Sequence, residues 1–175
     1  MSPEAQLLNA LAFAAAKHRD QRRKDAEASP YINHPIALAQ LLATTGGVTD
    51  PVVLQAAVLH DTVEDTDTSM EELTTHFGPQ VAAVVAELTD DKRLPKAQRK
   101  ALQVEHAPHK SVQAALVKLV DKTCNLRDII ASPPADWPLQ RRRDYFDWAL
   151  QVVQGLPAVS PALRAAFDAA YAQRP

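Results

Sequence analysis

Apolar residues recur along this chain at intervals of three and four positions, the spacing of one buried face of an α-helix. Three long segments show it most clearly: Leu7, Leu8, Leu11, Ala14 and Ala15; Val81, Val84, Val85 and Leu88; and Val112, Leu116, Leu119, Leu126 and Ile130. No stretch alternates apolar and polar residues between hairpin turns, as a half-buried strand would. The pattern predicts an all-α fold.

Residues that favour helix ends divide the chain further. Asp50-Pro51 and Ser160-Pro161 each combine an N-cap residue with a proline in the first helical position. Ser69 and Glu72 have the spacing of a capping box, and Gly78-Pro79 ends one helix and begins the next. The polar segment 20–33 is predicted to be a loop. We expect helices at residues 4–19, 35–44, 51–66, 70–77, 79–90, 95–106, 111–130, 138–154 and 160–173.

Composition limits the class of protein. The chain has 175 residues, of which 46% are apolar and 23% charged, as in one compact globular domain covering residues 1–175. The single cysteine, Cys124, excludes an internal disulfide and a cysteine-based zinc site.

No apolar run reaches the roughly 20 residues of a membrane span. The acidic Glu4 precedes the apolar stretch at residues 5–16, where a signal peptide would have basic residues. We expect a cytoplasmic protein without a membrane partner.

Charge is distributed unevenly. The formal net charge is −2, which argues against a general nucleic-acid partner. Cations nevertheless cluster at residues 22–24, 92–100 and 141–143. Such confined clusters suit a small anionic ligand, and they are also common on solvated helix faces.

Four ionisable residues follow directly on the apolar run 52–59. In the predicted helix 51–66, His60 and Glu64 lie four positions apart, as do Asp61 and Asp65, so each pair shares a face. Buried carboxylates beside a histidine destabilise a fold unless a cation accompanies them. This group therefore indicates a divalent metal site.

Two further positions are suited to such a site. His34 precedes a predicted helix, where it either binds a metal or caps a neighbouring carbonyl group. Asp121 interrupts the apolar segment 114–120, and a carboxylate at that place needs a partner. With Lys118, Asn125 and Asp128 it forms a polar stripe, which is either part of a site or a solvated face.

Together His34, His60, Asp61 and Asp121 offer two imidazoles and two carboxylates. This set suits Mn²⁺, Fe²⁺ or Zn²⁺ and leaves room for water and a phosphate oxygen. Either Glu64 or Asp65 is then placed to accept a proton from the water.

The order of these residues resembles the HD-domain metallohydrolases, with their pattern His…His-Asp…Asp. The chain is more closely similar to the RelA/SpoT hydrolase domain, and in particular to the small alarmone hydrolases of the metazoan SpoT homologue type. The resemblance covers nearly the whole chain and rests on residues 21–25, 30–35, 60–65, 89–96, 118–122, 125–127 and 145–148.

The resemblance implies a single HD-domain bundle of about nine to ten helices that binds one Mn²⁺, with Zn²⁺ or Fe²⁺ as alternatives. The implied activity removes the 3′-diphosphate of guanosine tetra- or pentaphosphate, (p)ppGpp, and yields GDP or GTP plus pyrophosphate.

The resemblance also implies roles for individual residues. The implied metal ligands are His34, His60, Asp61 and Asp121. Glu64 and Asp65 are the implied activators of water. The implied substrate contacts are Arg23 and Lys24 near a diphosphate, Asn125 at the sugar, Tyr145 along the nucleotide pocket, and Lys96 and Arg141 at phosphates.

The chain departs from the family pattern at Val120 and at Thr123-Cys124, which affects the expected shape of the base pocket.

Two alternative functions remain open on the sequence. One is another HD phosphohydrolase, acting on deoxynucleotides, cyclic nucleotides or the 2′-phosphate of NADPH. The other is a catalytically silent nucleotide-binding module. Few residues follow position 130, so we expect no synthetase or regulatory domain; the sequence leaves the oligomeric state open.

Overall fold

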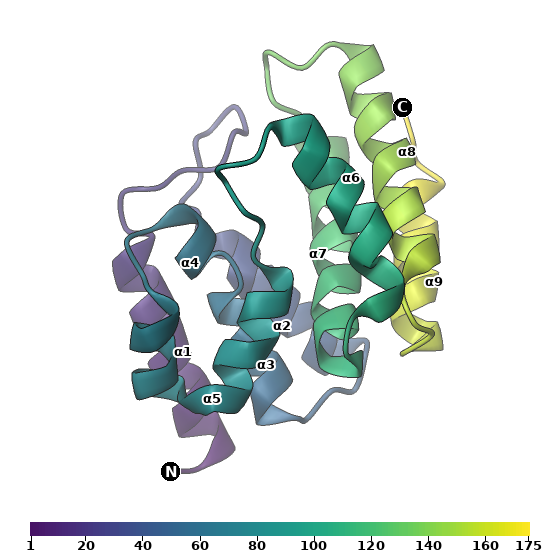
Figure 1. The fold of residues 1–175 in the computed structure, drawn as a ribbon. Coiled ribbons are helices and arrows are strands. Elements are labelled where there is room, and N and C mark those ends of the chain that lie inside the picture. Colours follow the sequence, from purple (N-terminus) through teal and green to yellow (C-terminus); the bar gives the residue numbers. More distant parts are fainter.

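The computed structural model describes residues 1–175 and is built entirely from helices (Figure 1). This confirms the all-α prediction. The elements are α1 (Pro3–Lys17), α2 (Asn33–Thr44), α3 (Pro51–Leu59), α4 (Thr62–Asp65), α5 (Met70–Leu88), α6 (Lys96–His106), the 3₁₀-helix η1 (Ala107–His109), α7 (Val112–Ala131), α8 (Leu139–Gly155) and α9 (Pro161–Tyr171). No helix is both long enough and apolar enough to cross a membrane.

Side-chain caps begin several helices where the sequence predicts them. The Asp50 carboxylate accepts a hydrogen bond from the Val52 amide, and Ser160 accepts one from the Leu163 amide. Ser69 likewise accepts from the amide of Glu72. The Glu72 carboxylate does not complete a capping box, because it pairs with Lys17 of α1 and so joins the first helix to the fifth.

Two breaks in the helices decide how the chain turns. At Gly78 the backbone has φ 84° and ψ 165°, so α5 consists of two helical segments that meet at a kink, as Gly78-Pro79 predicts. The second break, at His60 and Asp61, is a correction. The expected helix 51–66 is instead α3 and the single turn α4, separated by Asp61 with φ −101° and ψ 0°.

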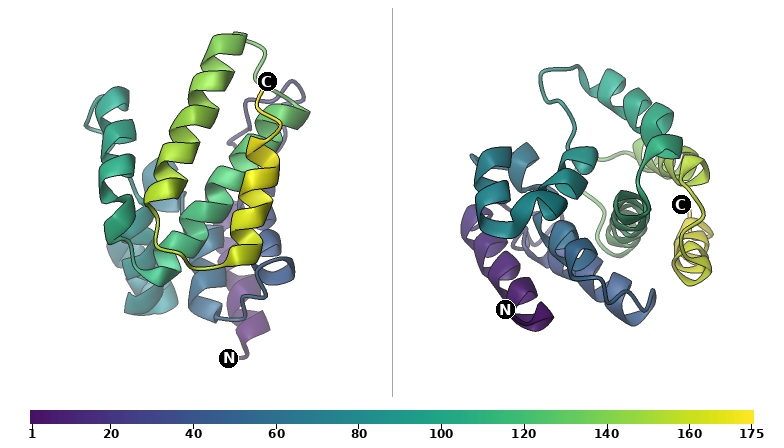
Figure 2. Two further views of the ribbon diagram at one scale, coloured as in Figure 1. Left: turned by 90° about the vertical axis from the view of Figure 1, so that its right-hand side faces the viewer. Right: turned by 60° about the horizontal axis from the view of Figure 1, so that its bottom comes forward.

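Helix α7 lies at the centre of the fold. Thirteen of its twenty residues are buried, and it packs against α2, α3 and α5 on one side and α8 and α9 on the other (Figure 2). Apolar side chains from all these helices form one cluster of 31 buried residues. Helix α6 has no buried residue and packs on α8. Polar side chains on α7 are therefore enclosed by neighbouring helices.

The polar segment 20–33 is a loop, as predicted, and its ends are held together. The amide of Tyr31 donates to the carbonyl oxygen of Gln21, and the amide of Arg23 donates to that of Ser29. Asp25 accepts hydrogen bonds from the amide and the hydroxyl of Ser29. These contacts fix the loop directly in front of the first turn of α2.

Candidate metal centre and nucleotide pocket

Two histidines and an aspartate from three helices meet inside the protein. His34 lies in the first turn of α2, His60 directly follows α3, and Asp121 lies in the middle of α7. His34 Nε2 is 3.1 Å from Asp121 Oδ1, and His60 Nε2 is 3.8 Å from the same oxygen. All three side chains have a ligand atom within 4.8 Å of the others. The structure thus brings together three of the four predicted metal ligands as one cluster.

The chemistry of this cluster fits a divalent cation. His60 Nδ1 donates to the carbonyl oxygen of Ala57 at 2.8 Å, which leaves Nε2 as the ring nitrogen that faces the cluster and could bind a metal. His60 Nε2 and His34 Nδ1 are both buried without a hydrogen-bond partner. Unpaired buried nitrogens beside a carboxylate are unfavourable without a ligand. Nitrogen and oxygen ligands together suit a divalent ion without selecting one metal.

Asp61, the fourth predicted ligand, borders the cluster. Its Oδ2 lies 2.9 Å from His60 Nε2 and accepts a hydrogen bond from the Tyr31 hydroxyl. The break after α3 explains this position, because adjacent residues in a continuous helix do not face the same point. The expected continuous helix is therefore wrong at this point, although the amide of Asp65 still donates to the carbonyl oxygen of Asp61 at 2.9 Å, one turn away. The break lets His60 and Asp61 approach the same region.

Electrostatics differ between the two histidines. Burial lowers the pKa of His34, and the neighbouring Asp121 carboxylate opposes this only in part. Burial also disfavours charge on His60, yet the carboxylates of Asp61 and Asp121 outweigh it and raise its pKa to about 9. Asp121 in turn has a pKa well below its usual range, because Lys122 and the histidines overcome its desolvation. The cluster thus holds ionised carboxylates ready for a cation.

The two candidate bases on α4 have different surroundings. Asp65 forms an ion pair with Lys92 and accepts a hydrogen bond from Gln21 Nε2 at 3.3 Å. Glu64 has no ion-pair partner. Burial and the charges of Asp61 and other nearby carboxylates raise its pKa to about 7. Of the pair, Glu64 has the properties of a proton acceptor near neutral pH.

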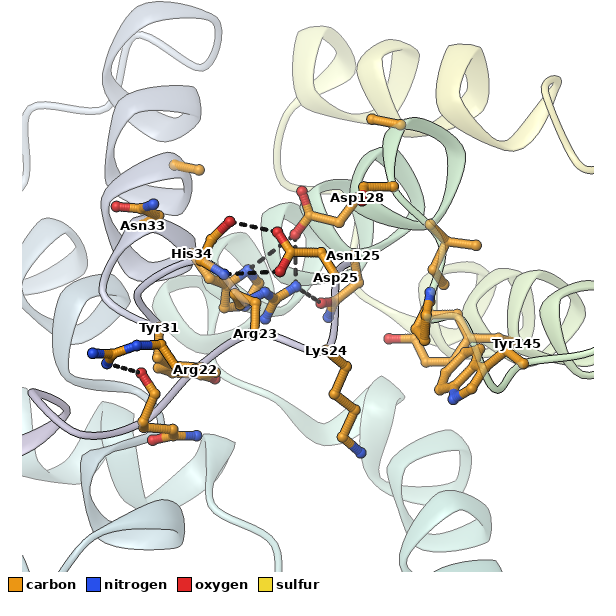
Figure 3. Close-up of a pocket in the computed structure, with 18 of the residues that line it drawn as sticks. Arg22, Arg23, Lys24, Asp25, Tyr31, Asn33, His34, Asn125, Asp128 and Tyr145 are labelled. Carbon is orange, nitrogen blue, oxygen red and sulfur yellow. Dashed lines mark hydrogen bonds and ion pairs between the residues drawn. The ribbon is translucent and has the colours of Figure 1, made fainter. Parts of the chain in front are cut away.

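A pocket of about 640 Å³ opens next to the cluster, with His34 in its wall (Figure 3). The loop 20–33 supplies Arg23 and Lys24, while α7 and α8 supply Asn125 and Tyr145. Its size is that of a typical small-molecule site. The pocket therefore joins four of the predicted substrate-binding residues to the candidate metal centre.

Hydrogen bonds fix several of these side chains. Arg23 donates to Asp128 Oδ2 at 2.6 Å and to Asn125 Oδ1 at 3.4 Å, and its guanidinium lies 5.6 Å from the centre of the Tyr31 ring. Asn125 Nδ2 donates to Asp121 Oδ1 at 2.9 Å. Burial raises the pKa of Tyr145, so its hydroxyl stays protonated. The pocket and the metal-ligand cluster thus form one connected network.

Lys96 and Arg141 lie outside the lining of this pocket but beside it. Burial, together with the charges of Arg141 and Lys24, lowers the pKa of Lys96. Arg141 lies over the ring of Trp137, 4.3 Å from its centre, and Trp137 lines the pocket. These two predicted phosphate contacts therefore extend the positive charge of Lys24 away from the cluster.

Several site residues received no role of their own in the sequence prediction, although some of them lie in the motifs 30–35 and 118–122. Tyr31 binds Asp61 and contacts Arg23, and Trp137 forms part of the pocket wall. Lys118 and Lys122 are buried on α7 beside Asp121. Tyr31 lies within the motif 30–35 that also contains His34, which could have drawn attention to it. Nothing in the local sequence around Trp137 indicates its position.

This all-α fold around a buried His, His and Asp cluster defines a helical domain with a candidate metal centre. The chain belongs to the HD domain family, whose model matches residues 10–146. The human protein named guanosine-3′,5′-bis(diphosphate) 3′-pyrophosphohydrolase MESH1 is 57% identical, over 99% of this chain and 97% of its own. The Drosophila melanogaster protein of the same name is 46% identical, over 98% and 96%.

Solved structures agree with this assignment. One is described as a metazoan ortholog of SpoT that hydrolyses ppGpp; it has a TM-score of 0.95 and 45% identity, and the match covers 99% of this chain and 98% of that one. The crystal structure of lmo0812 from Listeria monocytogenes EGD-e has a TM-score of 0.67 at 24% identity, which is a likeness of fold alone. The family resemblance found in the sequence is confirmed.

Proposed function

We propose that this protein is a metal-dependent (p)ppGpp 3′-pyrophosphohydrolase, which converts guanosine tetra- or pentaphosphate into GDP or GTP plus pyrophosphate and so ends the alarmone signal. The observation that carries this function is the joining of two features. A buried cluster suited to a divalent cation shares His34 with a pocket lined by Arg23 and Lys24. Relatives that match over nearly the whole chain bear the name of this activity.

In this proposal His34, His60, Asp61 and Asp121 hold one Mn²⁺, for which Zn²⁺ or Fe²⁺ could substitute. When bound, the ion supplies Lewis acidity and lowers the pKa of a water molecule. The buried Nε2 of His60, which has no hydrogen-bond partner, and the ionised carboxylate of Asp121 support this ligand set. Tyr31 orients Asp61 through its hydroxyl group.

Glu64 accepts the proton of the attacking water. The water oxygen forms a bond to the phosphorus attached to the ribose 3′-oxygen, the bond from that phosphorus to the 3′-oxygen breaks, and the 3′-oxygen gains a proton. The pKa of Glu64, raised to about 7, supports a group that can both accept and return a proton. Asp65, held by Lys92 and Gln21, orients the water from a fixed position.

The remaining residues bind the nucleotide. Arg23 and Lys24 meet a phosphate group, Asn125 contacts the sugar, and Tyr145 lies along the nucleoside. Lys96 and Arg141 contact a further phosphate at the edge of the pocket. Because displacement at phosphorus depends mainly on positioning and charge, this arrangement of fixed cations supports the proposed reaction.

A turnover assay with separated products tests the proposal. Purified protein is incubated with guanosine tetraphosphate in Mn²⁺, in Zn²⁺ and after chelation, with NADPH in parallel. We expect GDP and pyrophosphate in equal amounts, and no product after chelation. Orthophosphate from NADPH alone would replace the proposal with removal of the 2′-phosphate. Tight guanosine tetraphosphate binding without any product would indicate a silent binding module.

A further inference from the structure

Lys118 and Lys122 are two buried lysines on α7 that have no part in the reaction described above. Their exposed fractions are 5% and 4%. Because side chains four residues apart lie on one helix face, their ammonium groups extend from the same side of α7. Like charges placed together inside a protein lower its stability unless an anion lies with them. Such a pair therefore needs a negatively charged partner.

The protein supplies only part of that negative charge. Lys122 Nζ is 3.3 Å from Asp121 Oδ2, while the other oxygen of Asp121 faces the two histidines. Lys118 has no carboxylate within the 4.0 Å of an ion pair and forms no side-chain hydrogen bond. Its burial and the charge of Lys122 lower its pKa, whereas the more distant charges of Asp121, Asp90 and Asp61 raise it. Lys118 thus lies near the candidate metal ligands without a direct ion-pair or hydrogen-bond partner.

A third lysine reaches the same place from α6. Lys100 Nζ is 4.6 Å from the centre of the Trp148 ring, and Lys122 Nζ is 4.2 Å from the same centre. The indole nitrogen of Trp148 donates to the carbonyl oxygen of Lys100 at 3.0 Å, which ties α8 to α6. None of the three lysines lines the pocket that holds Arg23 and Lys24. They form a second positive region, on the α6–α8 side of Asp121.

We propose that Lys118 and Lys122, with Lys100 beside them, bind the distal phosphoryl group of the 3′-diphosphate and hold the released pyrophosphate. This inference rests on the proposed function. In this arrangement the phosphoryl group on the 3′-oxygen lies at the metal centre, and the outer phosphoryl group extends past Asp121. The outer group then supplies the negative charge that the protein does not provide for these lysines. Ammonium groups bind phosphate oxygens through charge-assisted hydrogen bonds. The site therefore distinguishes a diphosphate from a monophosphate on the sugar hydroxyl.

The first test measures binding of inorganic pyrophosphate to the Mn²⁺-loaded protein by calorimetry, with a fixed excess of Mn²⁺. Lys118→Met and Lys122→Met keep the apolar part of each side chain and remove the charge. We expect each to weaken pyrophosphate binding by about tenfold or more, as the loss of a charged hydrogen bond predicts. Because this assay needs no turnover, it reports on the site even if the proposed substrate is wrong. Wild-type pyrophosphate affinity in both variants would overturn the inference.

The second test compares substrates. For each variant, kcat/KM is measured with guanosine tetraphosphate and with an analogue that carries a single phosphate on the 3′-oxygen. We expect loss of about tenfold or more with the diphosphate and a change within about twofold with the monophosphate. An equal loss with both substrates would mean a structural role, and would overturn the inference while leaving the proposed function intact.

Lys110→Met is the matched control. Lys110 is also half-buried near Lys118 and Lys122, but its Nζ donates to the carbonyl oxygen of Glu87. If Lys110→Met weakens pyrophosphate binding as much as Lys118→Met and Lys122→Met do, the effect is a general one of positive charge and the inference fails.

Thermal unfolding of the ligand-free protein adds a further readout. Lys118→Met should raise Tm, because it removes an unpaired buried charge, whereas loss of a structural contact would lower it.

Discussion

The Nδ2 of Asn125 donates a hydrogen bond across 2.9 Å to Oδ1 of Asp121, one turn away on α7. That oxygen is also the one that faces His34 and His60. Asn125 therefore orients a candidate metal ligand in addition to lining the nucleotide pocket.

We predict that Asn125→Ala weakens Mn²⁺ binding by about tenfold or more, measured by metal titration. Gln113→Ala, which removes a distant amide bonded to Asp50, is the control. Unchanged metal affinity would restrict Asn125 to nucleotide contact.

Replacing a candidate metal ligand should remove metal and activity together. Asp61→Ala and Asp121→Ala each delete a carboxylate that borders Nε2 of His60. We expect metal content after purification to fall in proportion to the activity. Asp67→Ala removes an exposed carboxylate that pairs with Lys17 and should leave both unchanged. Full metal content in either test variant would remove that residue from the ligand set.

Glu64→Gln should separate proton transfer from metal binding. The amide keeps the size of the side chain but cannot accept a proton at neutral pH. We predict that kcat falls by about 10²–10⁴-fold while the metal content stays at the wild-type level. Asp65→Asn is the comparison, because its carboxylate is already paired with Lys92. Wild-type turnover by Glu64→Gln would transfer the role of base to Asp65.

The same residue should make stability depend on pH. Glu64 has a pKa near its ordinary 4.5 when the chain is unfolded and about 7 in the fold, so the folded protein binds this proton more tightly. The stabilising effect is complete below pH 4.5 and is lost as pH rises through 7. In the metal-free protein, wild-type Tm should therefore fall relative to that of Glu64→Gln between these values. A constant difference in Tm across this range would contradict the raised pKa.

The kink in α5 depends on glycine. Gly78 has φ 84° and ψ 165°, a conformation that residues with a Cβ rarely adopt. A Cβ there would meet no atom within 4 Å, so any effect of Gly78→Ala comes from backbone strain. We predict a loss of about 1–3 kcal/mol in the free energy of unfolding, measured with urea. Gly155→Ala, within helix α8 beside Ala107, tests crowding instead. Unchanged stability in Gly78→Ala would show that α5 rearranges at the kink.

Most helix positions followed from the sequence, because local signals fix them. N-cap residues such as Asp50 and Ser160, and the pair Gly78-Pro79, act on the backbone beside them. The break at His60 and Asp61 was missed because its cause is not local. The apolar run before it favours a continuous helix, whereas tertiary contacts hold both side chains at one point.

The identity of the candidate metal and pocket residues also followed from the sequence, since buried histidines and aspartates in this order are recognisable. The structure brings His34, His60 and Asp121 together, as that prediction requires, and their role as metal ligands stays a prediction. Which groups are paired and which are free was decided only by the tertiary structure. Asp65 is bound to Lys92, Glu64 is unpaired, and Lys118 is enclosed by helices that are distant in the chain. Burial and charge pairing depend on long-range packing, which no local pattern of residues determines.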